Sequence, residues 1–331
     1  MIDFAAHIIP PRMWARIDPL VGPMNRHAVE ANPGLVDLDI RRRTIDYFAG
    51  RGYRQLLSIS LQGTEDPAVA GILPDLCRAA NEELREIIDR DQALIGALGA
   101  LPLPHPTAAL REVDHIVELG LAGFQVYSSV AGRPLDEPAT LEVLEYAFGR
   151  GLVCLLHPVR APVPDYLGEE SSRLLLFRIL GWPYETSLAM VRLAFSGLLE
   201  RQPQAVIVAH HLGAMIPYFS ARIESHYSRR NDPELAVELP RPPMEYLHRF
   251  YGDTALNGGP HAVRCGVDFF GAEQVVFGSD YPFDNNDGLT YIQSSIDAVG
   301  GAGLAPGEMK AVFDGNARRL LRASGGEDPQ G

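Results

Sequence analysis

The chain has 331 residues, of which 46% are hydrophobic and 21% are charged, a composition typical of a soluble globular protein. Its formal net charge of −13 argues against a nucleic-acid partner, because nucleic-acid-binding surfaces need clustered basic side chains. No segment approaches the roughly 20 apolar residues of a membrane span, and Asp3 and His7 interrupt the run that a signal peptide would need. Three cysteines without short spacing (Cys77, Cys154, Cys265) are typical of reduced thiols. We therefore expect a cytoplasmic protein that binds neither nucleic acid nor membrane.

Strand-like and helix-like patterns alternate along the chain. The strand-like segments are residues 2–7, 53–60, 94–101, 122–127, 152–157, 205–210, 249–254 and 274–279. The helical patterns are residues 37–50, 67–90, 106–119, 137–150, 185–201, 214–229, 260–271 and 305–322. Eight of each is the count of a (β/α)8 TIM barrel, whereas a doubly wound sheet usually has a glycine-rich turn after its first strand. We predict a single α/β domain, a TIM barrel over residues 1–323, followed by a disordered polar tail over residues 324–331.

Two connections are longer than a barrel needs. Residues 8–36 contain five prolines and Trp14, and residues 158–184 run from one proline-rich stretch to Trp182. Both follow strand-like segments, so we expect them over the carboxyl face of the barrel, where barrel enzymes keep their active sites. Dimer contacts are the alternative role for part of each connection.

The first strand-like segment ends in His7. Strand side chains alternate between the barrel interior and the helix-facing side, so Asp3, Ala5 and His7 should share one side. Phe4 and Ile8 should share the other side, and their apolar side chains suit the shell between barrel and helices. We therefore predict that His7 points inward at the catalytic rim, although a lone histidine can also be structural.

Three later strand-like segments also end in His or Asp. His157 follows apolar residues, and Pro158 ends the pairing after it because proline lacks an N–H donor. His210 and His211 are adjacent, so in a continuing strand only one of them could face the pocket. Asp280 follows the last segment, at a place where a buried carboxylate needs a partner. Imidazoles and a carboxylate at the carboxyl ends of barrel strands predict a metal or substrate site.

These residues resemble the ACMSD-like amidohydrolase family (amidohydrolase-2), which includes aminocarboxymuconate-semialdehyde decarboxylase, hydroxybenzoate decarboxylases, and some hydratases and hydrolases. The resemblance covers nearly the whole chain. Beyond the strand ends it is carried by residues 101–103, 132–136, 181–186, 196–201, 251–255 and 316–320.

The resemblance implies roles for the strand-end residues. His7 matches the second His of the family's Asp-x-His-x-His motif, and His157 matches the metal-binding His of the fifth strand. Asp280 matches the eighth-strand Asp, which touches the metal and can move protons. Arg222 is similar to an arginine that the family uses near substrate carboxylates.

The resemblance also distinguishes between the two adjacent histidines. His211 matches the His of the family's His-x-Gly-Gly-x-x-Pro motif, because Gly213 lies two residues on and Pro217 six. This selects His211 as the pocket residue, with a catalytic role beside Asp280. We expect the neighbouring His210 at the outer edge of the pocket.

The chain departs from the family at Ala5, where the family has its first His, or Glu in some decarboxylases. His7, His157 and Asp280 remain as metal ligands, and two imidazoles with a carboxylate suffice for a catalytic ion with open positions. We expect a divalent ion, zinc or manganese, bound more weakly than by four ligands. The alternative is loss of the metal, which would leave His and Asp for metal-free acid–base chemistry.

The function implied by the resemblance is non-oxidative decarboxylation of a small aromatic or unsaturated carboxylic acid. Asp280 would protonate the ring carbon and would need a pKa raised toward neutrality. A metal, or an arginine such as Arg160 or Arg222, would hold the carboxylate and a neighbouring hydroxyl. Trp182 and Phe283 complete the predicted substrate contacts.

Two alternatives remain open. A hydrolase or hydratase would cleave a lactone, a cyclic amide or a related bond, with Asp280 or His211 activating water, with or without a metal. A catalytically inactive binding subunit is less favoured, because a dead site has no chemical reason to keep four desolvated polar groups. In each case the expected ligand is a small anionic molecule, and the resemblance implies a homodimer.

Overall fold

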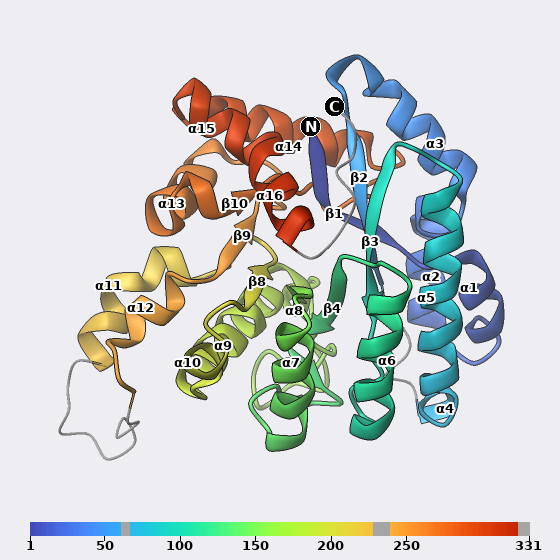
Figure 1. Cartoon of the computed structure of the whole chain (residues 1–331), viewed down its shortest axis with the longest axis horizontal. Coiled ribbons are helices and arrows are strands. Elements are labelled where there is room, and N and C mark those ends of the chain that lie inside the picture. The colour runs from blue at the N-terminus through green and yellow to red at the C-terminus, as the bar shows by residue number, and fades with distance from the viewer. Residues whose placement is uncertain (61–66, 228–238, 324–331) are drawn as a thin grey trace.

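The computed structural model describes residues 1–60, 67–227 and 239–323, and these residues form a barrel of parallel strands surrounded by helices (Figure 1). The strand order is β1-β2-β3-β4-β7-β8-β9-β10, so each barrel strand pairs with the next one along the chain. This arrangement confirms the predicted (β/α)8 TIM barrel. The predicted tail, residues 324–331, lies outside the described residues.

The barrel strands are β1 (Ile2–Ile8), β2 (Arg54–Ile59), β3 (Leu94–Ala100), β4 (Gly123–Tyr127), β7 (Val153–His157), β8 (Val206–Ala209), β9 (Tyr251–Asp253) and β10 (Val275–Val276), and β5 (Ser129–Val130) pairs with β6 (Arg133–Pro134) in a separate hairpin. The helices are α1 (Pro11–Ile17), α2 (Pro23–Ala31), α3 (Leu38–Tyr47), α4 (Pro67–Ala70), α5 (Leu73–Asp89), α6 (Pro106–Glu118), α7 (Pro138–Gly149), α8 (Leu176–Ile179), α9 (Gly181–Phe195), α10 (Leu198–Arg201), α11 (Ile216–Tyr227), α12 (Pro243–Leu247), α13 (Pro260–Phe270), α14 (Leu289–Gly301), α15 (Pro306–Lys310) and α16 (Asn316–Ala323).

The ring closes between β1 and the segment after β10. The backbone N–H of Phe4 donates to the carbonyl of Phe277, and that of His7 donates to the carbonyl of Tyr281, both at 2.8 Å. An isolated parallel bridge between Ala6 and Tyr281 lies between these two bonds. The first and last strands therefore hold each other in register, which brings His7 beside the residues that follow β10.

The predicted alternation of side chains between the two faces of β1 is wrong in the first half of the strand. The pairing of β1 with β2 shifts register between Asp3 and Ala6, a β-bulge that places two successive side chains on the same face. Phe4 therefore lies in the inner cluster with Leu56, while Asp3 points the other way and contacts Tyr53. Asp3 and Ala5 therefore lie on different sides of β1, although they would share a side in a regular strand.

Two buried clusters divide the apolar residues. The larger one fills the shell between the strands and the helices, and it includes Ile8 as predicted. The smaller one lies inside the barrel and combines Phe4 and Leu155 with Leu320 of α16. The last described helix thus packs its apolar side chains against residues inside the barrel, near the start of β1 (Figure 1).

The predicted helix at residues 305–322 is interrupted, and α14 was not predicted. The observed segment consists of α15, a π-helical turn at Ala311–Gly315 and α16. Helix α14 is rich in Ser, Gly and β-branched residues, which have low helix propensity. It forms because Ile292, Ser295 and Val299 are buried on one side of the helix, a tertiary effect that local propensity does not reveal.

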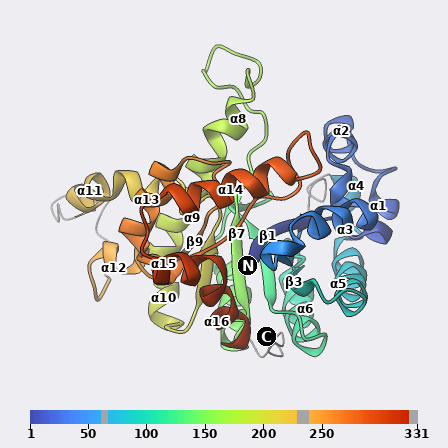
Figure 2. The same cartoon turned by 90° about the horizontal axis from the view of Figure 1, so that it is seen from above.

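Both long connections lie over the carboxyl face, as predicted. In Figure 2, α8 and α2 stand at one end of the barrel and α16 at the other. The loop before α8 projects furthest from the barrel.

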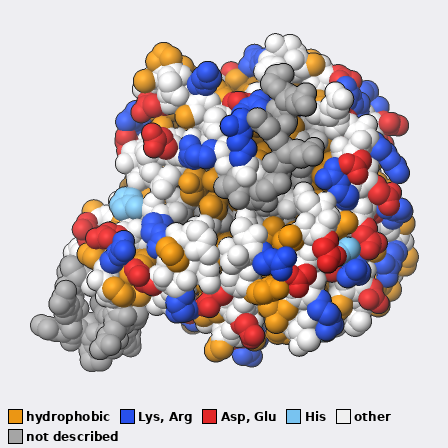
Figure 3. Space-filling view, in the orientation of Figure 1, with side chains coloured by type: hydrophobic (Ala, Val, Ile, Leu, Met, Phe, Trp, Pro, Cys, Tyr) orange, Lys and Arg blue, Asp and Glu red, His pale blue; other side chains and the backbone are white. Residues whose placement is uncertain are grey.

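No described helix is long and apolar enough to cross a membrane. Figure 3 shows basic and acidic side chains interspersed over the face in view.

Candidate active site

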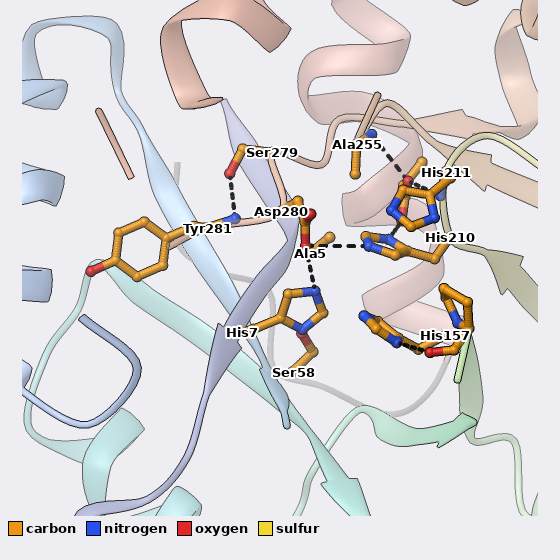
Figure 4. Close-up of polar contacts among 12 residues, drawn as sticks. Ala5, His7, Ser58, His157, His210, His211, Ala255, Ser279, Asp280 and Tyr281 are labelled. Atoms are coloured by element: carbon orange, nitrogen blue, oxygen red, sulfur yellow. Dashed lines mark hydrogen bonds and ion pairs between the residues drawn. The ribbon is translucent and has the colours of Figure 1, made fainter. Parts of the chain in front are cut away.

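Four side chains converge at the carboxyl end of the barrel: His7 near the end of β1, His157 at the end of β7, His210 directly after β8, and Asp280 after β10 (Figure 4). We call these four residues the histidine–aspartate cluster. One potential ligand atom from each lies within 4.8 Å of the others. All four are buried, with Asp280 the most exposed at 8%. Three imidazoles and a carboxylate at this spacing are a donor set that suits a divalent transition metal.

Each imidazole of the histidine–aspartate cluster is held from behind at Nδ1. The partner is Ser58 Oγ at 2.9 Å for His7, the Pro158 carbonyl at 2.7 Å for His157, and Asp253 Oδ2 at 2.6 Å for His210. Outer contacts of this kind fix the ring orientation of metal-binding histidines. Here they leave the Nε2 atom of each ring for the centre of the cluster.

The inner nitrogens lack well-aligned hydrogen bonds. His7 Nε2 and His210 Nε2 are fully buried, and the polar contacts they make are with Asp280 Oδ1, at 3.2 Å and 3.4 Å. Buried polar atoms without aligned partners are costly, and a cation between them would satisfy both. The cluster therefore fits a divalent ion on its own geometry.

The charges in the cluster are set by close contacts. Burial alone would lower the pKa of His210, but the Asp253 carboxylate outweighs it and raises the pKa to about 10. Burial would favour protonated Asp280, yet His210 and His7 hold its pKa well below the ordinary value. Burial and the neighbouring His210 lower the pKa of His157 well below the ordinary value. Asp280 is therefore ionised and His157 neutral, the states in which these groups ligate metals, whereas His210 would have to release the proton that Asp253 stabilises before it could bind an ion.

His211 lines the cavity beside the cluster, as the resemblance implied, but the expectation that His210 lies at the outer edge of the pocket is wrong. Strand β8 ends at Ala209, and His211 has a φ of 59°, in the left-handed region, so the side chains do not alternate. His210 enters the histidine–aspartate cluster, and the His211 ring lies 4.1 Å from it, centroid to centroid. Burial and His210 lower the pKa of His211 to about 3, so it is a neutral imidazole with an unpaired Nδ1.

Asp253 organises both histidines from the end of β9. Its carboxylate is fully buried, contacts His210 Nδ1, and accepts hydrogen bonds from the backbone N–H groups of His211 and Ala255 at 3.0 Å and 3.1 Å. Sequence reasoning missed both Asp253 and the cluster role of His210. The Asp at the end of the seventh barrel strand was the available signal.

Ala5 is fully buried and contributes no ligand atom. A Cβ added at Gly278 would lie 3.0 Å from Ala5 Cβ and 3.0 Å from Asp253 Cβ, so these three residues pack closely around one point. The position at which the family resemblance leads us to expect a further ligand therefore adjoins the Asp253–His210 pair.

A cavity of about 400 Å³ opens beside the cluster, a size that suits a small-molecule ligand. Both long connections contribute to its wall. The lining residues are Ala28, Asn32, Leu175, Arg178, Ile179, Trp182, Pro183, His211, Ala255, Leu256, Asn257, Asp280, Phe283 and Tyr291.

The predicted substrate-binding residues divide into two groups. Trp182 and Phe283 line the cavity. Arg160 does not line it, and its guanidinium is paired with Glu185 at 2.6 Å. Arg222 is exposed on α11, outside the barrel and away from the cavity lining, so the prediction that this chain places it beside its own substrate is not supported.

Known proteins resemble this chain over most of its length. It matches the amidohydrolase family over residues 2–323. It is 30% identical over 211 residues to 2-amino-3-carboxymuconate-6-semialdehyde decarboxylase of Dictyostelium discoideum, a match that covers 63% of this chain and 57% of that relative. It is 25% identical over 296 residues to gamma-resorcylate decarboxylase of Polaromonas sp., covering 86% and 88%.

A solved structure has the same fold. The dihydroxybenzoic acid decarboxylase of Polaromonas sp., with bound manganese and the inhibitor 2-nitroresorcinol, has a TM-score of 0.79 at 23% identity, and the match covers 97% of this chain and 96% of that one. At this identity the likeness shows the fold, and the sequence match over residues 2–323 shows the family. The chain therefore belongs to the amidohydrolase family.

Proposed function

We propose that this amidohydrolase is a metal-dependent, non-oxidative decarboxylase of a small aromatic or unsaturated carboxylic acid. The observation that carries the proposal is the histidine–aspartate cluster, whose Asp280 lines a small cavity together with His211. The relatives named above are decarboxylases, which favours this reaction over hydrolysis, hydration or a catalytically inactive role. As in those relatives, the enzyme would be a carbon–carbon lyase.

His7, His157, His210 and Asp280 would hold the divalent ion. Manganese is supported by the bound ion of the Polaromonas structure, and zinc by the three imidazoles. When bound, the ion would attract the substrate's anionic oxygens and stabilise negative charge that develops next to the departing carboxylate. The proposed site thus has four ligand residues, His7, His157, His210 and Asp280, instead of the three expected from the sequence.

The proton transfers belong to the residues of the chain. In decarboxylation the electron pair of the broken C–C bond stays on the ring carbon, which takes a proton as carbon dioxide leaves. We assign that proton to Asp280. Because His210 and His7 lower its pKa, instead of the rise expected from the sequence, Asp280 would first have to accept a proton from the bound substrate. His211, which is neutral and has an unpaired Nδ1, would orient a substrate oxygen or take part in this transfer.

Release of carbon dioxide tests the proposed reaction. Metal-loaded protein would be incubated with 2,6-dihydroxybenzoate, 6-methylsalicylate and 5-carboxyvanillate, and carbon dioxide would be measured directly. At least one acid should be decarboxylated, and Asp280→Asn should lower kcat by about 100-fold or more because the proton carrier is lost. Arg43→Gln, at an exposed site on α3, should retain full turnover. Equal turnover by wild type and Asp280→Asn would contradict the assignment.

We also propose that the protein is a homodimer and works in the cytoplasm. The loop before α8 exposes Tyr166, Leu167 and Leu174 at 75%, 108% and 81%, and apolar side chains gathered in this way are typical of an interaction surface. The three cysteines are unpaired, as expected in a reducing compartment. Light scattering after size-exclusion chromatography should give a dimer, and Leu167→Asp with Leu174→Asp should give a monomer. Tyr47→Asp, at an exposed site on α3, is the control and should leave the dimer intact.

A further inference from the structure

Arg178 is the only lysine or arginine among the described residues that line the cavity. Its Cζ lies 5.3 Å from the ring centroid of Phe177 and 5.5 Å from that of Trp182. Across the described ranges, no ion pair or side-chain hydrogen bond involves its guanidinium, whereas Arg160 on the same connection is paired with Glu185. Aromatic contacts thus hold the Arg178 guanidinium at the cavity wall without neutralising its charge.

Two donors on this wall lack acceptors. Arg178 Nε and Trp182 Nε1 are both buried and have no hydrogen-bond partner in the part of the chain that the structure describes. Buried donors without partners cost free energy that a bound acceptor would recover. Arginine remains charged even where burial lowers its pKa, so the acceptor that suits this pair is an anion.

The position of Trp182 indicates which part of a substrate would reach this anion site. The Trp182 ring centroid lies 6.0 Å from that of His157, in the histidine–aspartate cluster, and Arg178 contacts the same indole. The carboxylate that leaves must lie beside Asp280 and the cluster. An arginine that also bound that carboxylate would stabilise the substrate more than the transition state, in which its charge is dispersed. Arg178 therefore suits a different group, one that stays on the substrate.

We propose that Arg178, together with Trp182, binds a second acidic group of the substrate, which is retained through the reaction. The preferred substrate is therefore a diacid, with one carboxylate lost at the cluster and the other anionic group held at the wall. This inference rests on the proposed decarboxylase function and narrows its substrate class.

Benzoate and isophthalate are the probes that test this inference, because they differ by one carboxylate and lack the ortho hydroxyl that would activate the ring for decarboxylation. Their binding to metal-loaded protein would be measured by titration calorimetry. Wild type should bind isophthalate about tenfold or more tightly than benzoate, as expected for one charge-assisted contact. Arg178→Gln should remove this preference, and Arg178→Lys should keep part of it.

Arg173→Gln is the matched control, because Arg173 lies exposed in the same connection and does not line the cavity. This variant should keep the wild-type preference. Equal affinities of wild type for the two acids, including no detectable binding of either, would overturn the inference, as would a preference that survives in Arg178→Gln.

The outcome is separable from that of the decarboxylation test. Carbon dioxide release from a monoacid, with no effect of Arg178→Gln on binding, would support the decarboxylase function and contradict the diacid substrate. A preference for isophthalate that depends on Arg178, without any carbon dioxide release, would support the anion-binding site and contradict the proposed decarboxylation.

Discussion

We propose that His210 supplies the imidazole that the family resemblance leads us to expect at position 5. Ala5 is buried beside Gly278 and Asp253, and Asp253 contacts His210 Nδ1 at 2.6 Å. This potential ligand comes from the end of β8, whereas Ala5 on β1 offers none. The cluster keeps three imidazoles and one carboxylate despite the methyl group at position 5.

His210→Ala should weaken divalent-metal binding by about 100-fold, because it removes a ligand atom from a four-residue set. Asp253→Asn should cost roughly 10- to 100-fold, because the ring of His210 loses its charged partner. Elemental analysis and competition with a chromophoric chelator would measure both.

His211→Ala is the control for this series, since His211 lies beside the histidine–aspartate cluster but outside it. It should keep wild-type metal affinity and lose activity. Ala5→His in the His210→Ala background should recover part of the affinity, whereas Ala5→His alone should destabilise the packed interior by about 1–3 kcal/mol. Unchanged metal affinity in His210→Ala would contradict the ligand assignment.

Much of the site could be predicted from the sequence, because polar residues at the ends of apolar segments are easily recognised. His7, His157 and Asp280 were all found in this way, and the structure brings all three together. His210 was missed because its placement depends on a left-handed residue after β8, which alternation rules do not anticipate. Arg178 was missed because only the folded α8 connection reveals which arginine is left without a partner.

At the scale of elements, Asp3 joins the first strand to the last. Its buried carboxylate accepts hydrogen bonds from the backbone N–H groups of Ala5 and Ser279 and from the hydroxyls of Ser279 and Tyr53. Ser279 precedes Asp280, so this network positions the Asp280 carboxylate. The bulge in β1 turns Asp3 toward these partners.

Asp3→Ala should lower the free energy of unfolding by about 3 kcal/mol, because several buried donors would lose their acceptor. Urea unfolding would measure the loss, and a lowered metal affinity would show that Asp280 has moved. Asp297→Ala, on the exposed side of α14, should change stability by less than about 0.5 kcal/mol. Equal stabilities of Asp3→Ala and wild type would show that the network contributes nothing.

The bulge and α14 mark the limit of element prediction from this sequence. The alternation of apolar strand-like and amphipathic helix-like segments predicted the number of barrel strands and the ring of helices around them, since the barrel strands are buried and the longer helices have an apolar side. It could not place Phe4, because the bulge is stabilised by contacts of Asp3 with residues far along the chain. It could not find α14, whose low propensity is overcome by burial.

Helix α16 packs into the inner cluster near the start of β1. Leu320 is 2% exposed there, beside Phe4 and Leu155. Leu320→Ala should lower the free energy of unfolding by about 2–5 kcal/mol, because it leaves a cavity among residues that cannot easily collapse. Leu188→Ala, at a 41% exposed leucine on α9, should cost much less. Chemical denaturation measures both, and similar losses would show that α16 does not stabilise the barrel interior.

At the scale of the whole molecule, the histidine–aspartate cluster connects strands that are distant in sequence. Its ligand atoms come from β1, β7 and the segments after β8 and β10, so the site exists only when the barrel is closed. An ion that binds the folded state alone stabilises it, by about 2.7 kcal/mol at 100 times its Kd. Manganese or zinc added to chelator-treated protein should therefore raise the unfolding temperature by roughly 5 °C or more. The same shift is expected in His211→Ala and a much smaller one in His157→Ala. Calorimetric scans that show identical unfolding temperatures with and without the ion would contradict metal binding at the cluster, and with it the proposed metal-dependent decarboxylation.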